Sequence, residues 1–195
     1  SVAFPVVAGL GAGSCVEISN MDFDDPQGDA AVIDFLIAMG AKIEKDTENG
    51  RLIVNGGAPL HGITIDMTNT PDALPILSVA AALAEGPTVL DNIVGTRLKE
   101  TDRAKVMAEM LTRMGVNVEE EENRLTIYGN GKLQGAVVDS YDDHRIAMSM
   151  TVAGLLAEGE THVNHAECAA VTFPEFFKKM NDINASIQIV PLAEE

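Results

Sequence analysis

Two stretches of the chain are apolar around almost the whole circumference of a helix. They are residues 73–85 (ALPILSVAAALAE) and 146–157 (IAMSMTVAGLLA). A helix that is hydrophobic on all sides is buried. Each stretch has about a dozen residues, fewer than the roughly 20 needed to cross a bilayer. We therefore expect both to be central helices of a domain core.

A second pattern, with apolar residues at i, i+3 and i+4, begins after Gly28 and again after Asp102. This spacing predicts amphipathic helices lying on a sheet, and a glycine after each predicts its C-terminal cap. A β-rich stretch broken by a polar turn follows each helix, which predicts a hairpin. The apolar positions are Ile33, Leu36 and Ile37, then Met107, Met110, Leu111 and Met114; the glycines are Gly40 and Gly115; the turns are 47–50 and 121–124.

These patterns belong to an internal repeat. Segments starting at Pro5, Ser78 and Thr151 align without gaps and are evenly spaced; we call their common spacing the repeat offset. The strand-like segments from Gly62 and Gly135 keep the same offset. The patterns within one unit therefore predict the element order βαβαββ: strand, buried helix, strand, amphipathic helix and hairpin. Three units should pack about a pseudo-threefold axis as a single α/β domain. Their approximate ranges are 1–61, 62–134 and 135–195, the first lacking its initial strand.

Composition narrows the possible partners. Thirty acidic and thirteen basic residues give a formal charge of −17, which repels polyanions, so we expect no nucleic-acid partner. No apolar run reaches the length of a membrane span, and we expect no membrane partner. The two cysteines and four histidines lack the spacing of zinc motifs, so we expect no metal site and a reducing compartment, the cytoplasm.

The repeat also relates two charged residues. Asp72 and Arg145 are one repeat offset apart, each at the start of a predicted buried helix, where free backbone N–H groups and the helix dipole favour anions. The KETDR segment at 99–103 opens the second amphipathic helix, which would place Glu100 and Arg103 on one face. Two arginines can hold a carboxylate or phosphate, and two carboxylates in different surroundings can divide acid and base duties.

Each of these motifs has a purely structural interpretation when it is taken alone. KETDR is typical of a helix cap, DDHR at 142–145 of an Asx-turn with His144 hydrogen-bonded, and Asp72 of a turn after proline. Their occurrence together at the strand-to-helix junctions of related units favours a substrate site.

Four segments in this order closely resemble the C-terminal domain of the 5-enolpyruvylshikimate-3-phosphate (EPSP) synthase family. They are residues 70–88, 92–115, 139–155 and 168–177. The resemblance implies an inside-out α/β barrel, as in enolpyruvyl transferases and RNA 3′-phosphate cyclases, with the site between two such domains. It also implies transfer of the enolpyruvyl group of phosphoenolpyruvate to the 5-hydroxyl of shikimate 3-phosphate, in the shikimate pathway, with no metal or organic cofactor.

The resemblance further implies roles for individual residues. Asp72 would accept the proton of the attacking hydroxyl, and Glu100 would serve the methylene carbon of phosphoenolpyruvate. Lys99 would lie near the phosphate of shikimate 3-phosphate. Arg103 and Arg145 would clamp phosphoenolpyruvate, and His144 would support the site.

Two positions depart from the family pattern. Val171 stands where many members have a lysine that contacts phosphoenolpyruvate, and Gly95 where many have an asparagine that contacts the shikimate phosphate. The motifs of the other domain are absent, so we expect the chain to be inactive without that N-terminal domain. The alternative is a non-catalytic, degenerate paralogue that binds a small phosphorylated acid or a partner domain.

Overall fold

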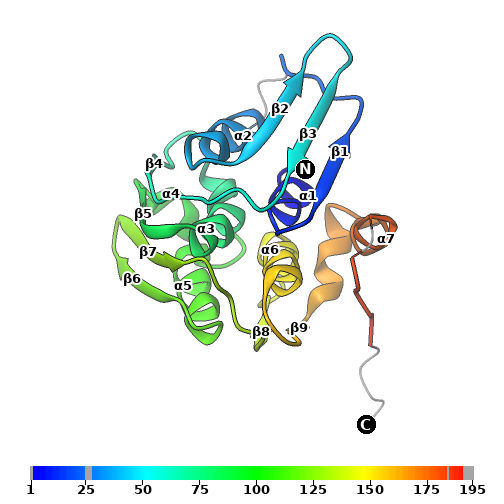
Figure 1. Cartoon of the computed structure of the whole chain (residues 1–195). Coiled ribbons are helices and arrows are strands. Elements are labelled where there is room, and N and C mark those ends of the chain that lie inside the picture. The colour runs from blue at the N-terminus through cyan, green and yellow to red at the C-terminus, as the bar shows by residue number, and fades with distance from the viewer. Residues whose placement is uncertain (1, 25–27, 184, 191–195) are drawn as a thin grey trace.

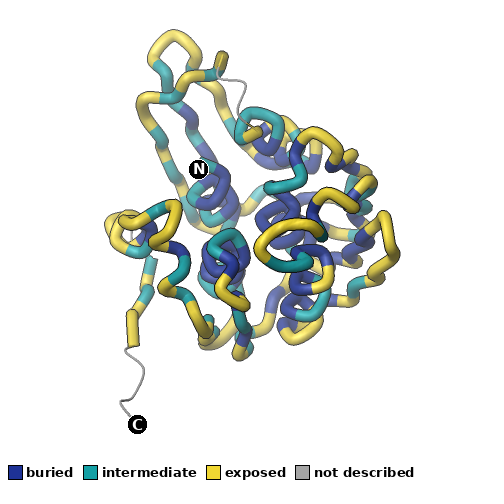
Figure 2. Tube along the Cα trace, turned by 180° about the vertical axis from the view of Figure 1, so that it is seen from behind, coloured by how far each residue is buried: buried dark blue, intermediate teal, exposed yellow. Residues whose placement is uncertain are grey.

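Three helices of mainly apolar sequence pack together at the centre of the molecule (Figure 1). The computed structural model describes residues 2–24, 28–183 and 185–190. Within it the three helices are α1 (Ala3–Ala8), α3 (Leu74–Leu83) and α6 (His144–Leu156), and each contacts the other two. Most of their residues are buried (Figure 2). Both expected core helices are confirmed, and α1 lies at the equivalent place in the first unit.

Short sheets lie around these helices. The first has the order β1-β3-β2 and is antiparallel; the second has the order β4-β5-β7-β6; the third is the parallel pair β8-β9. The strands are β1 (Cys15–Ile18), β2 (Lys42–Asp46), β3 (Arg51–Asn55), β4 (Thr64–Asp66), β5 (Glu85–Asp91), β6 (Asn117–Glu121), β7 (Arg124–Asn130), β8 (Val137–Asp139) and β9 (His162–Asn164). The two predicted hairpins, β2–β3 and β6–β7, are confirmed.

The two predicted amphipathic helices are also confirmed, as α2 (Asp29–Ala38) and α5 (Arg103–Arg113). Gly40 and Gly115 follow them with positive φ, and the residue after each glycine donates its N–H to the carbonyl five residues back. This is the Schellman ending that glycine favours. The remaining helical segments are η1 (Pro71–Ala73), α4 (Val94–Arg97), η2 (Ala166–Val171) and α7 (Phe176–Asp182).

The repeat offset reappears in the backbone pairing. Thr64 pairs with Val89 between β4 and β5, and their equivalents one offset further on, Val137 and His162, pair between β8 and β9. Equivalent glycines also lie where two neighbouring segments of the backbone approach each other closely. A Cβ on Gly62 would collide with the carbonyl oxygen of Pro87, and one on Gly135 with that of Glu160. The repeated sequence therefore folds into repeated local structure.

The third unit departs from the expected βαβαββ order. After β9 the described chain forms η2 and α7, and residues 185–190 join no strand ladder within the described part. The two observed hairpins span 42–55 and 117–130, whereas 185–190 has the length of a single arm. A third hairpin is therefore wrong for the described residues. Helix α7 begins one repeat offset after α5, so the second helix of the third unit is confirmed. It is held by ring contacts from Phe176 to Phe4, Phe173 and Phe177.

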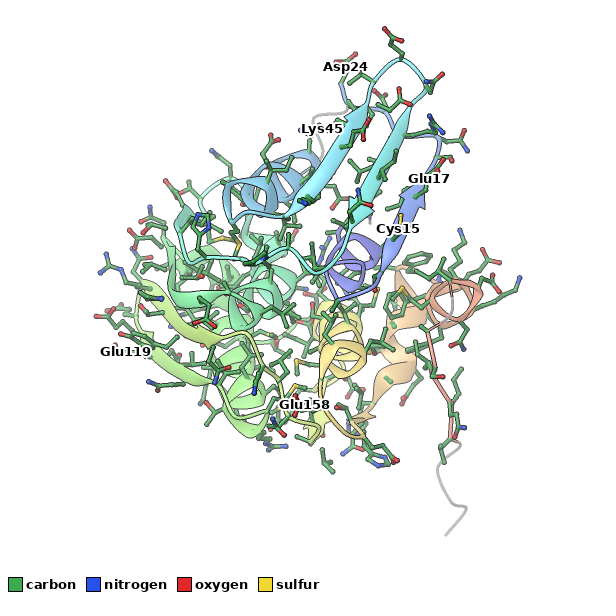
Figure 3. The ribbon with its side chains drawn as sticks, in the orientation of Figure 1. Cys15, Glu17, Asp24, Lys45, Glu119 and Glu158 are labelled. Carbon is green, nitrogen blue, oxygen red and sulfur yellow. The ribbon has the colours of Figure 1, made fainter. Side chains whose placement is uncertain are left out.

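Acidic side chains lie over the periphery of the molecule. Glu17, Glu119 and Glu158, for example, come from separate elements and point outward (Figure 3). Among the described residues, no helix combines the length and the apolar character that a membrane span needs. Because acidic side chains dominate the periphery, an anionic substrate needs a local group of basic residues.

Candidate functional site

A buried arginine connects three carboxylates from three parts of the chain. The guanidinium of Arg103, on a side chain only 1% exposed, contacts Asp72 through Nη1 at 2.8 Å and Glu100 through Nη2 at 2.6 Å. Its Nε and Nη2 bind both oxygens of Asp143, at 2.9 and 3.2 Å. Four of its five N–H donors are thus used. Arg103 therefore joins the starts of α3, α5 and α6.

The Glu100–Arg103 contact does not come from a shared helix face. Helix α5 begins at Arg103, and its N-cap is Asp102, whose carboxylate accepts the N–H of Lys105 at 3.1 Å. Glu100 lies in the preceding loop and reaches back to the guanidinium. The expected proximity is confirmed, but its helical explanation is wrong, because the capping aspartate starts the helix after Glu100.

Asp143 is a site residue that the sequence reasoning missed. Its carboxylate is fully buried, caps α6 by accepting the N–H of Arg145 at 2.9 Å, and accepts the hydroxyl of Thr101 at 3.0 Å. Burial raises its pKa, but the hydrogen bond and charge of Arg103 outweigh that effect, so the pKa of Asp143 lies below its usual value. The sequence held one signal: Asp143 stands where the second unit has the uncharged Thr70.

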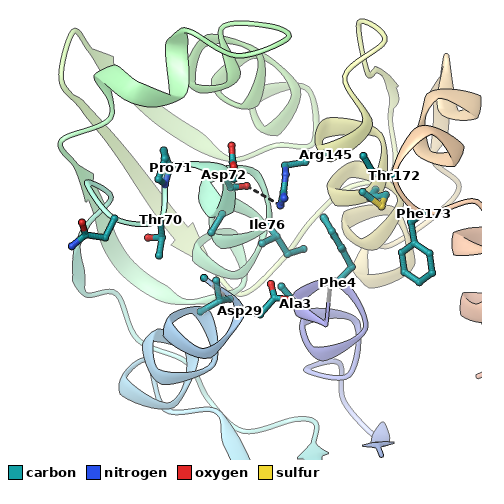
Figure 4. Close-up of a pocket in the computed structure, with 15 residues that line it drawn as sticks. Ala3, Phe4, Asp29, Thr70, Pro71, Asp72, Ile76, Arg145, Thr172 and Phe173 are labelled. Atoms are coloured by element: carbon teal, nitrogen blue, oxygen red, sulfur yellow. Dashed lines mark hydrogen bonds between the residues drawn. The ribbon is translucent and has the colours of Figure 1, made fainter. Parts of the chain in front are cut away.

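Asp72 lies among three cations. Its carboxylate contacts Lys99 Nζ at 3.1 Å as well as Arg103, and its carbonyl oxygen accepts a hydrogen bond from Arg145 Nη1 at 3.4 Å (Figure 4). Partial burial raises the pKa of Asp72, but the contact with Lys99 and the charges of Arg145 and Arg103 lower it more. Asp72 is therefore ionised at neutral pH.

The cluster as a whole is electrically balanced. Three carboxylates, Asp72, Glu100 and Asp143, face three cations, which are Lys99, Arg103 and Arg145. The three cations offset the three carboxylates within this cluster, although the whole chain carries −17. Among the described residues, no three His, Cys, Asp or Glu side chains are grouped as a metal ion would require.

A cavity of about 360 Å³ opens beside Asp72 and Arg145 (Figure 4). Its walls come from the starts of α1, α2, α3 and α6 and from the segment before α7, including Thr172 and Phe173. This volume is at the lower end of the range for small-molecule sites. Arg145 lines the cavity, whereas the guanidinium of Arg103 is enclosed by carboxylates, so the two arginines are not equivalent.

The remaining predicted residues lie at the same place. His144 is the first residue of α6, and its Nδ1 lies 3.7 Å from Glu100 Oε1. The nearest atom to a Cβ built on Gly95 is the Cβ of Pro71, at 3.7 Å, so this departure adjoins the Asp72 turn. Val171 is 77% exposed and precedes Thr172 of the cavity wall. The structure brings all six predicted site residues together, while their chemical roles stay predictions.

Comparison with known proteins identifies the family of this chain. The family model for EPSP synthase (3-phosphoshikimate 1-carboxyvinyltransferase) matches residues 1–180. The chain belongs to the EPSP synthase family. This confirms the resemblance identified from the site motifs, and with it an enzyme family of the shikimate pathway.

Curated and solved members of the EPSP synthase family show the extent of the match. The 3-phosphoshikimate 1-carboxyvinyltransferase of Methanocella arvoryzae is 44% identical over 189 residues, which are 97% of this chain and 44% of that protein. That of Ruminiclostridium cellulolyticum is 45% identical over 89% of this chain and 40% of its own. The EPSP synthase structure from Acinetobacter baumannii superposes with a TM-score of 0.85 at 32% identity, covering 96% of this chain and 46% of that one. The expected α/β fold is confirmed, and the chain spans less than half the length of these relatives.

Proposed function

We propose that the protein containing this chain transfers the enolpyruvyl group of phosphoenolpyruvate to the 5-hydroxyl of shikimate 3-phosphate and releases phosphate. The observation that carries the proposal is the Arg103-centred cluster: Asp72 and Arg145 line one cavity, and Arg103 connects Asp72 to Glu100, on a chain of the EPSP synthase family. Addition to an enol ether needs one group to remove a proton and another to supply one.

Asp72 and Glu100 divide these duties in the proposal. The hydroxyl oxygen attacks the substituted carbon of phosphoenolpyruvate while its proton passes to the ionised carboxylate of Asp72. Glu100, in its protonated form, delivers a proton to the methylene carbon, which becomes a methyl group. In the second half the Glu100 carboxylate takes a proton back from that methyl group while the bond to phosphate breaks, which regenerates the double bond. The proton held by Asp72 leaves with the phosphate. Lys99, in contact with Asp72, lies on the path of the first proton.

The two arginines contribute in different ways. Arg145 lines the cavity and is the principal contact for the carboxylate or phosphate of phosphoenolpyruvate. Arg103 holds Asp72 and Glu100 in place. It acts on the ligand through these two carboxylates, because its side chain is only 1% exposed. His144, near Glu100, supports that carboxylate.

The chain is, in this proposal, the C-terminal domain of the enzyme, and it is inactive without the N-terminal domain that closes over the cavity. The proposed single domain comprises three repeat units, of about 1–61, 62–134 and 135–195. The proposed compartment is the cytoplasm, which the free thiols of Cys15 and Cys168 in the described structure support.

Phosphate release from both substrates tests the function. We expect turnover by the complete protein, none by the isolated chain, and a loss of at least about 100-fold in kcat for Glu100→Gln in the complete protein. Glu109→Gln is the matched control, because Glu109 is an exposed glutamate of α5 paired with Arg113. Full activity of Glu100→Gln would remove Glu100 from the mechanism.

The non-catalytic alternative rests on Gly95 and Val171, where two expected substrate contacts are missing. Calorimetric titration of the complete protein with shikimate 3-phosphate and phosphoenolpyruvate, followed by analysis for product, separates the two functions. Binding without product would support the alternative, whereas product formation would exclude it.

A further inference from the structure

The loop that carries Lys99 and Glu100 has little backbone support. Residues 99–101 form no backbone-to-backbone hydrogen bond within the described structure, and Leu98, just before them, is 82% exposed. Side-chain contacts must therefore determine where Lys99 and Glu100 lie. Lys99 and Glu100 contact Asp72 and Arg103 of the site itself. A further residue connects the loop to the β6–β7 hairpin.

That residue is Arg97, the last residue of α4. Its Nη1 contacts both carboxylate oxygens of Asp102, at 3.0 and 2.9 Å, and so joins the two ends of the loop. The same nitrogen donates to Glu120 Oε1 at 2.7 Å. Its Nε and Nη2 donate to the carbonyl oxygens of Glu122 and Glu121, at 2.9 and 2.6 Å. The Arg97 side chain is 17% exposed. Its contacts with Asp102 are partly buried, and those with Glu120, Glu121 and Glu122 lie at the surface.

The β6–β7 turn also receives the start of α4. The N–H of Ile93 donates to the carbonyl oxygen of Asn123, and the N–H of Val94 donates to Asn123 Oδ1, each at 3.4 Å. Arg97 thus completes an attachment of the whole 93–102 segment to the hairpin. Because β6 and β7 belong to the four-stranded sheet, these contacts anchor the loop to a rigid element.

We propose that Arg97 is a positioning residue that holds Lys99 and Glu100 in their working geometry. This inference rests on the proposed function. The repeat supports a specific role, because the equivalent position in the third unit is Ala170. Of these two units, the one whose loop carries the KETDR motif has the arginine. Lysine cannot replace it fully, since its single ammonium lacks the divergent donors that reach four acceptor groups.

Proteolysis of the complete protein tests the attachment without any assay of activity. Endoproteinase Lys-C cleaves after lysine, so cleavage after Lys99 reports local opening of the loop. We expect Arg97→Met to accelerate this cleavage at least about 10-fold, with Arg97→Lys between it and the wild type. Cleavage after Lys132 in the same digest should not change. Arg124→Met is the matched control, because Arg124 forms a more exposed ion pair with Asp91 in the same sheet.

Kinetics of the same variants test the consequence for catalysis. A displacement of about 1 Å in a catalytic group can cost about 100-fold in rate, so Arg97→Met should lower kcat about 10- to 100-fold and alter KM far less. Arg97→Lys should recover part of kcat, and Arg124→Met should match the wild type. Unchanged Lys99 cleavage, or unchanged kcat with faster cleavage, would overturn the proposal. A wild-type protein without turnover would instead refute the proposed function and leave the cleavage result standing.

Discussion

At the scale of single residues, the Arg103–Asp143 pair organises the site. Asp143 binds the guanidinium side-on through two oxygens, and this orientation directs the other N–H groups to Asp72 and Glu100. Both partners are almost fully buried, at 1% and 0% exposure. A buried pair of this kind is costly to break, because the remaining charge has no solvent to stabilise it.

Removal of the buried carboxylate should therefore destabilise the protein strongly. We expect Asp143→Ala to lower the free energy of unfolding by about 3–5 kcal/mol, measured by urea denaturation at pH 7. Asp91→Ala, which removes an exposed partner of Arg124, should cost less than about 1 kcal/mol. Similar losses in the two variants would contradict the importance assigned to Asp143.

The same pair should make stability depend on acid pH. The pKa of Asp143 is lowered in the folded state, so its contribution is complete above the unfolded value of about 3.9 and is lost as pH falls through the lower folded value. The stability difference between the wild type and Asp143→Asn should therefore shrink below about pH 4. Urea midpoints at pH 7, 4 and 3 measure it, and a difference that grows in acid would contradict this origin.

At the scale of elements, the two parallel strand pairs end in the same way. Asn92 follows β5 and donates to Asp66 at 3.1 Å, and its equivalent in the third unit, His165, follows β9 and contacts Asp139 at 3.0 Å. Both Asn92 and His165 have positive φ, at 58° and 56°. In the second unit the aspartate is therefore bound by an amide, which does not titrate. In the third unit it is bound by a histidine, which does.

The histidine copy should respond to pH near neutrality. The hydrogen bond and charge of Asp139 raise the pKa of His165 above its usual 6.5. Its stabilising contribution is therefore complete below about pH 6.5 and is lost as pH rises through the raised value. An NMR titration should give a pKa above 6.5 for His165, and His165→Asn should abolish this part of the pH dependence of unfolding. A measured pKa at or below that usual value would contradict the contact.

At the scale of the whole molecule, aromatic packing joins the two ends of the described chain. Phe176 of α7 is 1% exposed, and its ring lies 6.0 Å from that of Phe4 in α1 and 5.6 Å from that of Phe173. Figure 1 shows α7 beside the first sheet and α1. These contacts hold α7, which begins one repeat offset after α5, against α1.

Loss of this ring should loosen the third unit from the first. We expect Phe176→Ala to lower the free energy of unfolding by about 3–5 kcal/mol, the cost of a large buried cavity. Phe177→Ala, at a less buried ring of the same helix, should cost less. Thermal or urea unfolding measures both, and equal effects would show that Phe176 does not hold α7.

Local patterns in the sequence predicted the helices, the hairpins and the repeat, because hydrophobic periodicity and glycine caps act within a few residues. α3, α6, β2–β3 and β6–β7 were all predicted from such patterns. The offset between units related Asp72 to Arg145, and the position of the charged motifs at strand-to-helix junctions predicted that the other candidates lie near them. Glu100 was wrongly placed on the face of α5, because Asp102 caps that helix and leaves Glu100 in the preceding loop.

By itself, then, the amino-acid sequence determined the repeat, the core helices and the motifs that identify the family, since all three are properties of neighbouring residues and of their spacing. Only the tertiary structure decided how the charges pair. Arg103 meets Asp72 across 31 residues and Asp143 across 40, and Arg97 meets the carbonyl of Glu122 across 25. Such pairings depend on how separate elements pack and on which charges that packing withdraws from water, and no local pattern encodes either.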